Sequence, residues 1–318
     1  MFQLGSQSNE VGRSAMASML PFLTNEQIAQ FHEDGFLVIE NLLNEELVSR
    51  LIDRFEPLFS GEFETGVYPD GWHWNPYLGL PNATKQITGG VWKSDLTLAS
   101  VALSEKIGQL CAMLAGWDGA RLMGDGLWQK PYGSGETTMH WDLQYSYHTP
   151  EDLVSSWLAL SDAMPGTSTM EYVKGSHQWA SSEPVNKFDV PSKGYRWMME
   201  QAAKRAGVEH PEILQLELKP GSCVFHNGKI WHGSGENVMP GKIRRSLALI
   251  HIPAESRFKS TGAYVPGGYN AGRYKRYGDD SMDESFFPIV WRQDGYRTPF
   301  LADYCDDALA KTATLVGG

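Results

Sequence analysis

The sequence predicts a mainly β domain of the barrel or jelly-roll type with flanking helices. Two observations predict this fold. Apolar residues at helical spacing dominate the chain up to residue 114, and after it short β-rich segments alternate with turns. Strands this short and this closely spaced are typical of a barrel or a jelly roll. The expected strands cover Leu122–Gln129, Thr138–Leu143, Val154–Leu160, Leu214–Leu218, Ser222–His226 and Ser246–Ile252.

Helices are expected first, after a loose N-terminal arm over residues 1–20. Thr24 and Gln27 have the spacing of a capping box, so ordered structure is expected to begin there, and Gly35 ends that helix. The remaining sequence, residues 21–318, is expected to form a single domain. Its other predicted elements are a strand over Phe36–Ile39, a helix from Asn44 that Pro57 stops, a helix over Leu96–Leu114 and a helix over Tyr195–Ala206.

Composition limits the possible partners. The 318 residues are 42 % hydrophobic, which excludes wholesale disorder, and the net charge of −11 makes nucleic acid an unlikely partner. The chain has no run of eighteen apolar residues and no convincing secretory signal, so we expect no membrane partner. Three widely spaced cysteines fit a reducing compartment. The prediction is a soluble, cytoplasmic, globular protein.

Two stretches are predicted to be lids over the site. Residues 61–92 are rich in glycine, proline and aromatic residues, and residues 181–213 interrupt the strands as an insertion. Long loops within a compact domain are usually functional. The aromatic content, including Trp72 and Trp74, suggests a partly apolar small-molecule substrate, such as a secondary-metabolite or amphipathic scaffold.

A metal site is predicted from His140, Asp142 and His232. Residues i and i+2 of a strand point to the same face, so His140 and Asp142 can bind one ion. Two imidazoles and one carboxylate can occupy one face of an octahedral iron, which is the ligand set of non-haem Fe(II) oxygenases. His226 is the main rival of His232, but a turn signal at Asn227-Gly228 separates them and favours His232.

Arg244 and Ser246 are candidates for binding a carboxylate beside the metal. Arg244 lies twelve residues beyond His232, and Ser246 follows at the start of a predicted strand. A guanidinium matches a carboxylate with two parallel hydrogen bonds. The alternative is that Arg244 forms an ordinary surface salt bridge.

The sequence resembles the phytanoyl-CoA dioxygenase family from about residue 24 to residue 255. These proteins are Fe(II)- and 2-oxoglutarate-dependent oxygenases with a double-stranded β-helix, a cupin-like jelly roll. Several ordered blocks carry the resemblance: Thr24–Phe59, Trp128–Gly135 leading into His140-Trp141-Asp142, Trp157–Leu160, Gly175-Ser176-His177, and His232–Asn237 with Arg244-Arg245.

The resemblance implies a role for each matching residue. His140, Asp142 and His232 would ligate iron, and Arg244 with Ser246 would hold the distal carboxylate of 2-oxoglutarate. Gln129 and Trp157 would line the cosubstrate pocket. The implied reaction uses O2, decarboxylates 2-oxoglutarate to succinate, and hydroxylates or otherwise oxidises an unactivated C–H bond of a small organic molecule.

The sequence departs from the family pattern at a few positions, and other functions are possible for the same residues. Ser222 stands where the family often has Asp, and Thr167-Ser168-Thr169 replaces a common Asn-Gly, which affects loops rather than the metal ligands. A halogenase is not expected, because Asp142 keeps the carboxylate that halogenases lose. The alternatives are a cupin-type zinc hydrolase or isomerase, since two histidines and an acid also hold zinc, and a non-catalytic small-molecule-binding relative.

Overall fold

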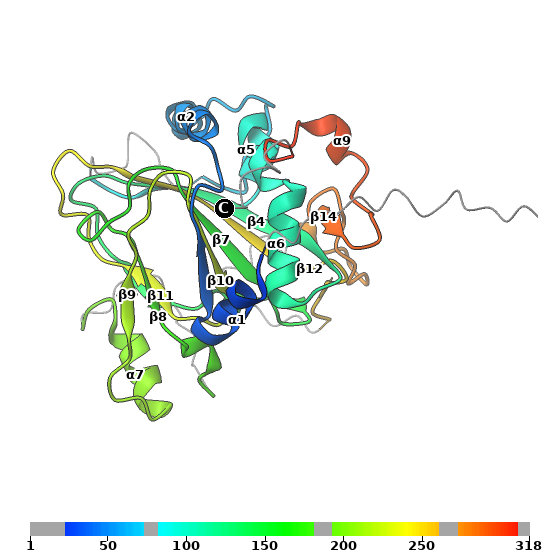
Figure 1. Ribbon diagram of the computed structural model, residues 1–318. Helices are drawn as coiled ribbons and strands as arrows, with labels where there is room; N and C mark the ends of the chain where they lie inside the picture. Colours follow the sequence, from blue (N-terminus) through cyan, green and yellow to red (C-terminus); the bar gives the residue numbers. More distant parts are fainter. Residues whose placement is uncertain (1–22, 73–81, 181–192, 261–272, 311–318) are drawn as a thin grey trace, which may run out of the picture.

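The computed structural model describes residues 23–72, 82–180, 193–260 and 273–310. Two antiparallel sheets pack face to face, and helices cover the outer face of the larger sheet (Figure 1). This arrangement has the predicted class of a β fold with flanking helices. The predicted arm over residues 1–20 and parts of both predicted lids, residues 73–81 and 181–192, lie outside the described residues.

The larger sheet has the strand order β1-β10-β7-β12-β4-β3-β2, and β14 pairs with β4. Its central strands are long and buried on both faces, which suits a sheet between a helical layer and a second sheet. The strands are β1 (Phe36–Ile39), β2 (Gly71–Trp72), β3 (Lys85–Thr88), β4 (Gly119–Lys130), β7 (Val154–Ala159), β10 (Cys223–Asn227), β12 (Arg244–Pro253) and β14 (Ile289–Arg292).

The smaller sheet has the order β5-β11-β8-β9. Its strands are β5 (Thr137–His140), β8 (Met170–Val173), β9 (Ile213–Gln215) and β11 (His232–Ser234), and a separate pair is formed by β6 (His148–Thr149) and β13 (Arg257–Phe258). Between the sheets, buried apolar residues of both inner faces pack together: Phe36, Trp157, Val224, Met170, Tyr172 and Leu218.

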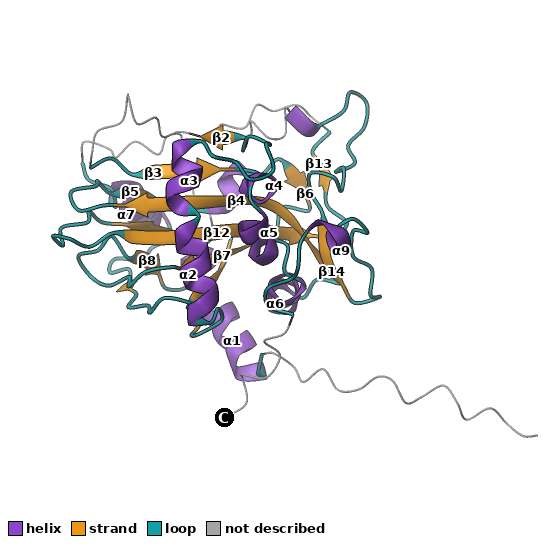
Figure 2. Ribbon diagram, turned by 90° about the horizontal axis from the view of Figure 1, so that it is seen from above, coloured by secondary structure: helices purple, strands orange, loops and turns teal. Residues whose placement is uncertain are grey.

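Helices form the third layer. Seen from above, α2, α3, α5 and α6 lie across one face of the larger sheet (Figure 2), while α7 lies beside the smaller sheet (Figure 1). The helices are α1 (Asn25–Asp34), α2 (Glu45–Asp53), α3 (Phe55–Ser60), α4 (Val91–Ser94), α5 (Leu96–Ala102), α6 (Glu105–Ala115), α7 (Trp197–Arg205) and α9 (Leu301–Tyr304). Short 3-10 turns cover Asp142–Tyr145 and Ser176–Gln178.

The predicted helix boundaries are confirmed where capping residues signalled them. Thr24 and Gln27 form the capping box of α1, and the side chain of Asn44 accepts a hydrogen bond from the Leu47 amide at the start of α2. Gly35 ends α1 with φ +86°, a conformation that glycine adopts without steric cost.

Three expectations about local structure were wrong. Pro57 does not stop the helical region, because it lies in the first turn of α3, where its missing N–H has no partner to lose. The single helix expected over residues 96–114 is two helices, since a new one begins after Ser104. Within the predicted lid, residues 85–88 form strand β3, whose only fully buried residue is Ile87.

One stretch of the described residues, Leu96–Ala115, is long and apolar enough to cross a membrane. It corresponds to α5 and α6, and 72 % of it is buried inside the fold. Core helices of globular domains have the same character. The stretch is therefore weak support for a membrane span, and the cytoplasmic location stays a prediction.

Candidate metal centre

The smaller sheet brings two of the predicted ligands together. His140 on β5 and His232 on β11 are direct cross-strand partners, and Tyr172 on β8 is the partner of His232 on its other side. Directly opposed residues of paired strands share a face. The three side chains therefore form one row, with the imidazole centroids of His140 and His232 4.3 Å apart.

The larger sheet contributes a second row that faces the first. His226 on β10 is the cross-strand partner of Phe36 on β1 and of Ser155 on β7. The two rows meet where the ring of Tyr172 stacks on Phe36, with centroids 5.0 Å apart, and where the Tyr172 hydroxyl contacts Nδ1 of His226 at 3.0 Å. The space between the rows is where Asp142 lies.

Asp142 reaches this space from the first residue of the 3-10 turn that follows β5. Its Oδ1 is 3.5 Å from Nε2 of His140 and 3.5 Å from Nε2 of His232. One potential ligand atom from each of the three residues lies within 4.8 Å of the others. The expectation that strand parity alone would align His140 and Asp142 was incomplete, since Asp142 is outside β5.

The hydrogen bonds of the two imidazoles prepare them for a metal. Nδ1 of His140 donates to the Thr138 carbonyl at 2.7 Å, and Nδ1 of His232 donates to the Ile230 carbonyl at 3.0 Å. These bonds place the proton on Nδ1 and leave the Nε2 lone pair directed at Asp142. A donor set of two neutral nitrogens and one carboxylate oxygen fits Fe(II).

Protonation favours the same conclusion. Burial lowers the pKa of His232 to about 3, so this ring is neutral at ordinary pH. Burial alone would raise the pKa of Asp142, but His232, His140 and His226 outweigh it and hold the pKa well below its usual value. The site thus combines a neutral imidazole with an ionised carboxylate, the forms in which these groups bind metals.

The structure separates His226 from the candidate ligand group. β10 ends at Asn227, and the chain then crosses to the smaller sheet, where β11 begins with His232. Nε2 of His226 contacts the other oxygen of Asp142, Oδ2, at 3.1 Å. His226 therefore borders the candidate site behind the carboxylate, and it lies on a different strand from His232.

Arg244 and Ser246 lie together on the inner face of β12. Nη1 of Arg244 donates to Oγ of Ser246 at 2.7 Å, and the guanidinium lies over the ring of Trp157, 5.3 Å from its centroid. Arg244 is 3 % exposed, and burial lowers its pKa to about 10, so it stays charged at neutral pH. Among the described residues it has no acidic partner within ion-pair distance.

A buried cation without an acidic partner is costly unless an anion is bound beside it. The alternative of an ordinary surface salt bridge does not fit a side chain that is buried and unpaired with any described acid. Arg244, Ser246 and Trp157 therefore form a buried cluster whose chemistry suits a carboxylate.

Gln129 does not lie with Arg244, Ser246 and Trp157. It is the cross-strand partner of Arg245, and its side-chain oxygen accepts a hydrogen bond from Nε of Arg245 at 2.9 Å. Because side chains alternate along β12, Arg245 and Gln129 lie on the face opposite Arg244. Lys130, the next residue, takes the inner position and is the cross-strand partner of Arg244.

Lys130 was not anticipated from the sequence. It is 1 % exposed, and its Nζ lies within hydrogen-bond distance, 2.7–3.1 Å, of four oxygens of the smaller sheet and its loops, to which its three N–H groups can donate. Burial and the nearby Arg244 lower its pKa well below the usual value. The acceptors are the Gly135 carbonyl and the hydroxyls of Thr137, Ser168 and Ser234.

His148 and Trp72 each contact other parts of the fold. His148 is fully buried and contacts the Ser146 hydroxyl and the Asp152 carbonyl. Trp72 packs edge-on against Phe63 in the helical layer, and Trp74 lies outside the described residues. A contact of Trp72 or Trp74 with substrate stays a prediction.

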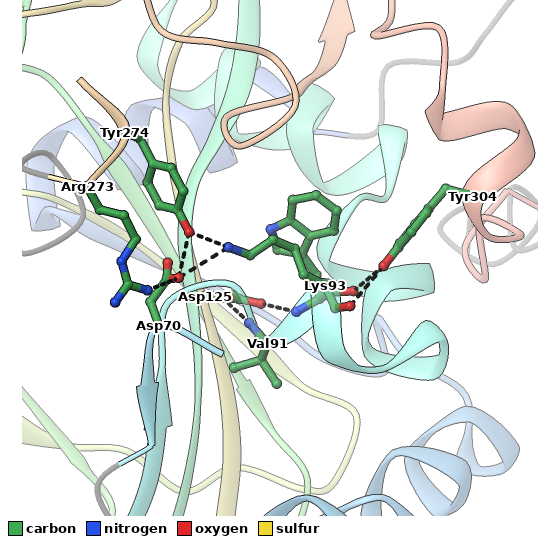
Figure 3. Close-up of polar contacts among 8 residues, drawn as sticks. Asp70, Val91, Lys93, Asp125, Arg273, Tyr274 and Tyr304 are labelled. Atoms are coloured by element: carbon green, nitrogen blue, oxygen red, sulfur yellow. Dashed lines mark hydrogen bonds and ion pairs between the residues drawn. The ribbon is translucent and has the colours of Figure 1, made fainter. Parts of the chain in front are cut away.

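The basic stretch 273–276 is bound up in ion pairs. Arg273, Tyr274 and Lys93 converge on the Asp70 carboxylate at 2.8, 2.6 and 3.2 Å (Figure 3). The other cations of the stretch also have acidic partners: Lys275 pairs with Asp280 at 2.8 Å and Arg276 pairs with Asp283. The cations of this stretch are therefore paired with acidic side chains of the same chain.

Comparison with known proteins places the chain in a family. Residues 31–246 match the family model described as phytanoyl-CoA dioxygenase (PhyH), which is more than half of the chain. The chain belongs to this family. Among curated relatives, it is 25 % identical over 244 residues to the multifunctional dioxygenase prhA of Penicillium brasilianum, covering 73 % of each chain. It is 22 % identical over 262 residues to a phytanoyl-CoA dioxygenase of Arabidopsis thaliana, covering 71 % of this chain and 88 % of that one.

Solved structures share the fold. The non-haem α-ketoglutarate-dependent carbocyclase SnoK from nogalamycin biosynthesis aligns with a TM-score of 0.64 and 18 % identity over 85 % of this chain and 97 % of that one. EctD from S. alaskensis with 2-oxoglutarate and 5-hydroxyectoine aligns with a TM-score of 0.57 and 20 % identity over 74 % of this chain and 78 % of that one. The predicted cupin-like jelly roll is confirmed.

Family membership also confirms the predicted enzyme class, a dioxygenase. Together with a His-Asp-His group suited to iron, it confirms the expected cofactors, Fe(II) and 2-oxoglutarate with O2.

Proposed function

We propose that this dioxygenase hydroxylates an unactivated C–H bond of a small organic molecule and converts 2-oxoglutarate to succinate in the same turnover. The proposal rests on two features that lie between the two sheets. A carboxylate oxygen lies equidistant from two Nε2 atoms, and a buried guanidinium lies on the facing sheet without a described acidic partner.

In this proposal each side chain has one task. His140, Asp142 and His232 hold the iron, and their hydrogen bonds to carbonyls fix the imidazoles before the metal arrives. Arg244 and Ser246 bind the distal carboxylate of 2-oxoglutarate, and the ring of Trp157 packs against the Arg244 guanidinium. Iron with 2-oxoglutarate and O2 supplies the oxidising power, while the chain orients the reactants and limits water access.

The substrate is proposed to be a small molecule of the secondary-metabolite or amphipathic kind. Two proteins of the same fold support this proposal, since one is a carbocyclase of nogalamycin biosynthesis and the other was solved with 5-hydroxyectoine. Cyclisation, desaturation and epoxidation start from the same oxidation of a C–H bond. The position of the substrate then determines which product forms.

The triad assignment is tested by succinate release. We expect His140→Ala and Asp142→Ala each to abolish iron-dependent conversion of 2-oxoglutarate, because each removes one of three ligands. The measurement is anaerobic loading with Fe(II), followed by O2 and quantification of succinate. His251→Gln, which changes a buried histidine that contacts Cys111 of α6, is the control. Wild-type-like succinate production by either triad variant would overturn the assignment.

A further inference from the structure

The two oxygens of Asp142 have different surroundings. Oδ1 faces Nε2 of His140 and of His232 at 3.5 Å each. Oδ2 accepts a hydrogen bond from the Ser155 hydroxyl at 2.6 Å and contacts Nε2 of His226 at 3.1 Å. The carboxylate is therefore held by one oxygen and presented with the other.

We propose that His226 is a positioning residue for the metal centre: oriented by Tyr172, it holds Oδ2 of Asp142 so that Oδ1 alone is offered to the iron. The inference rests on the proposed function, because it gives Asp142 the role of a ligand. His226 itself touches neither the metal nor the cosubstrate in this arrangement.

The hydrogen-bonding capacity of each group fixes the direction of the chain. An ionised carboxylate only accepts hydrogen bonds, so Nε2 of His226 must carry the proton that it donates to Oδ2. In a neutral ring Nδ1 is then an acceptor, and the Tyr172 hydroxyl donates to it at 3.0 Å. The bonds run from Tyr172 through His226 to Asp142, with every donor matched to an acceptor.

Packing restricts the positions of these three hydrogen-bonded side chains. Tyr172 is fully buried and is clamped between Phe36, with centroids 5.0 Å apart, and His232, with centroids 5.8 Å apart. Tyr172 belongs to the smaller sheet and His226 to the larger one. The position of the ligand carboxylate therefore depends on a contact between the two sheets.

The consequence for the metal is a single carboxylate ligand atom. Two imidazoles and one oxygen occupy one face of an octahedral ion and leave the opposite positions open. A carboxylate that rotated to bind through both oxygens would take one of those positions. Groups that orient metal ligands in this way typically change metal affinity by about 10- to 100-fold when removed.

The test compares Co(II) binding by wild type and five variants of the full chain. Co(II) is used because it is stable in air and its visible absorption reports the coordination geometry. We expect His226→Leu to weaken Co(II) binding by about 10- to 100-fold and to alter the absorption bands. His226→Gln keeps an amide N–H that can reach Oδ2, and we expect it to stay within a few-fold of wild type.

A second variant separates positioning from packing. Tyr172→Phe keeps the buried ring and removes only the hydroxyl, and we expect a smaller loss of Co(II) affinity than for His226→Leu. In the double variant with His226→Leu, the Tyr172→Phe effect should disappear, because it acts through the imidazole. The matched control is His251→Gln, a buried histidine that contacts Cys111 in the helical layer, and it should bind Co(II) like wild type.

The outcomes distinguish this inference from the proposed function. If wild type binds Co(II) and His226→Leu binds it equally well, the positioning role is wrong and the proposed function stands. Equal losses in His226→Leu and His226→Gln would make His226 itself a ligand and would overturn the inference. If wild type binds no Co(II) or Fe(II), the proposed function fails first. Melting temperatures of all variants identify any change that is only a loss of folding.

Discussion

The two faces of the larger sheet are built from the same strands, β7, β10 and β12, yet they have opposite characters. The outer face is mainly apolar and packs against α5, α6 and the N-terminal helices, through Leu158, Cys223, Phe225, Leu247 and Leu249. The inner face is buried too, but it carries polar groups at the alternate positions, among them Ser155, His226, Arg244 and Ser246.

This difference shows how one strand can serve stability and chemistry at once. A buried polar group needs a partner, and on the inner face the partners are other members of the site. Ser155 and His226 bond Asp142, and Ser246 bonds Arg244. Substitutions of neighbouring residues in one strand should therefore have different effects, one on stability and the other on ligand binding.

The largest contrast is expected at Ser246 and Leu247. Leu247→Ala should lower the free energy of unfolding by about 2–5 kcal/mol, since it empties a fully buried position of the apolar face. Ser246→Ala should change stability little and weaken 2-oxoglutarate binding by a few-fold, because one hydrogen bond of the clamp is lost. Denaturant unfolding and cosubstrate titration measure the two effects. The account would be contradicted if Leu247→Ala affected only binding.

A second contrast concerns two adjacent arginines. Arg244→Met should weaken 2-oxoglutarate binding by about 2–3 kcal/mol, roughly 30- to 150-fold, because a buried charged hydrogen bond is removed. Arg245→Met is the matched control, since Arg245 lies on the outer face with Gln129 and Phe55. Equal losses in the two variants, measured by calorimetry with Fe(II)-loaded or Co(II)-loaded protein, would sink the assignment of the pocket to the inner face.

The smallest contrast is in pH dependence. Burial against α6 lowers the pKa of His251 to about 3, against 6.5 for an ordinary histidine. Between these values the unfolded chain binds a proton that the folded one does not, so the free energy of unfolding falls as the pH falls, by about 1.4 kcal/mol per pH unit for this residue. In His251→Gln, the slope of the free energy of unfolding against pH should be smaller by about 1.4 kcal/mol per pH unit between pH 6 and pH 4. Denaturant unfolding at several pH values would show identical slopes if the prediction is wrong.

The sequence predicted the candidate ligands because their signals are local. His140 and Asp142 are two residues apart, and the turn signal after Asn227 separates His226 from His232. The family resemblance then supplied Arg244, Ser246 and Trp157, which the structure brings together.

Features that depend on pairing between distant strands could not be predicted in this way. The sequence could not show which face Gln129 occupies, because that depends on the register of β4 against β12. A shift of one residue moves a side chain to the other face. Tyr172, Ser155 and His226 meet only because two sheets stack, which no periodicity in one segment reveals. β3 was missed because it is a short strand with a single fully buried side chain.

An anaerobic titration of Fe(II) into the metal-free protein with 2-oxoglutarate tests the metal and cosubstrate assignments together. The account predicts a visible metal-to-ligand charge-transfer band for wild type and for Arg245→Met. With Arg244→Met, the band should appear only at much higher cosubstrate concentration. A protein that binds zinc tightly but shows no band with Fe(II) and 2-oxoglutarate would contradict the account.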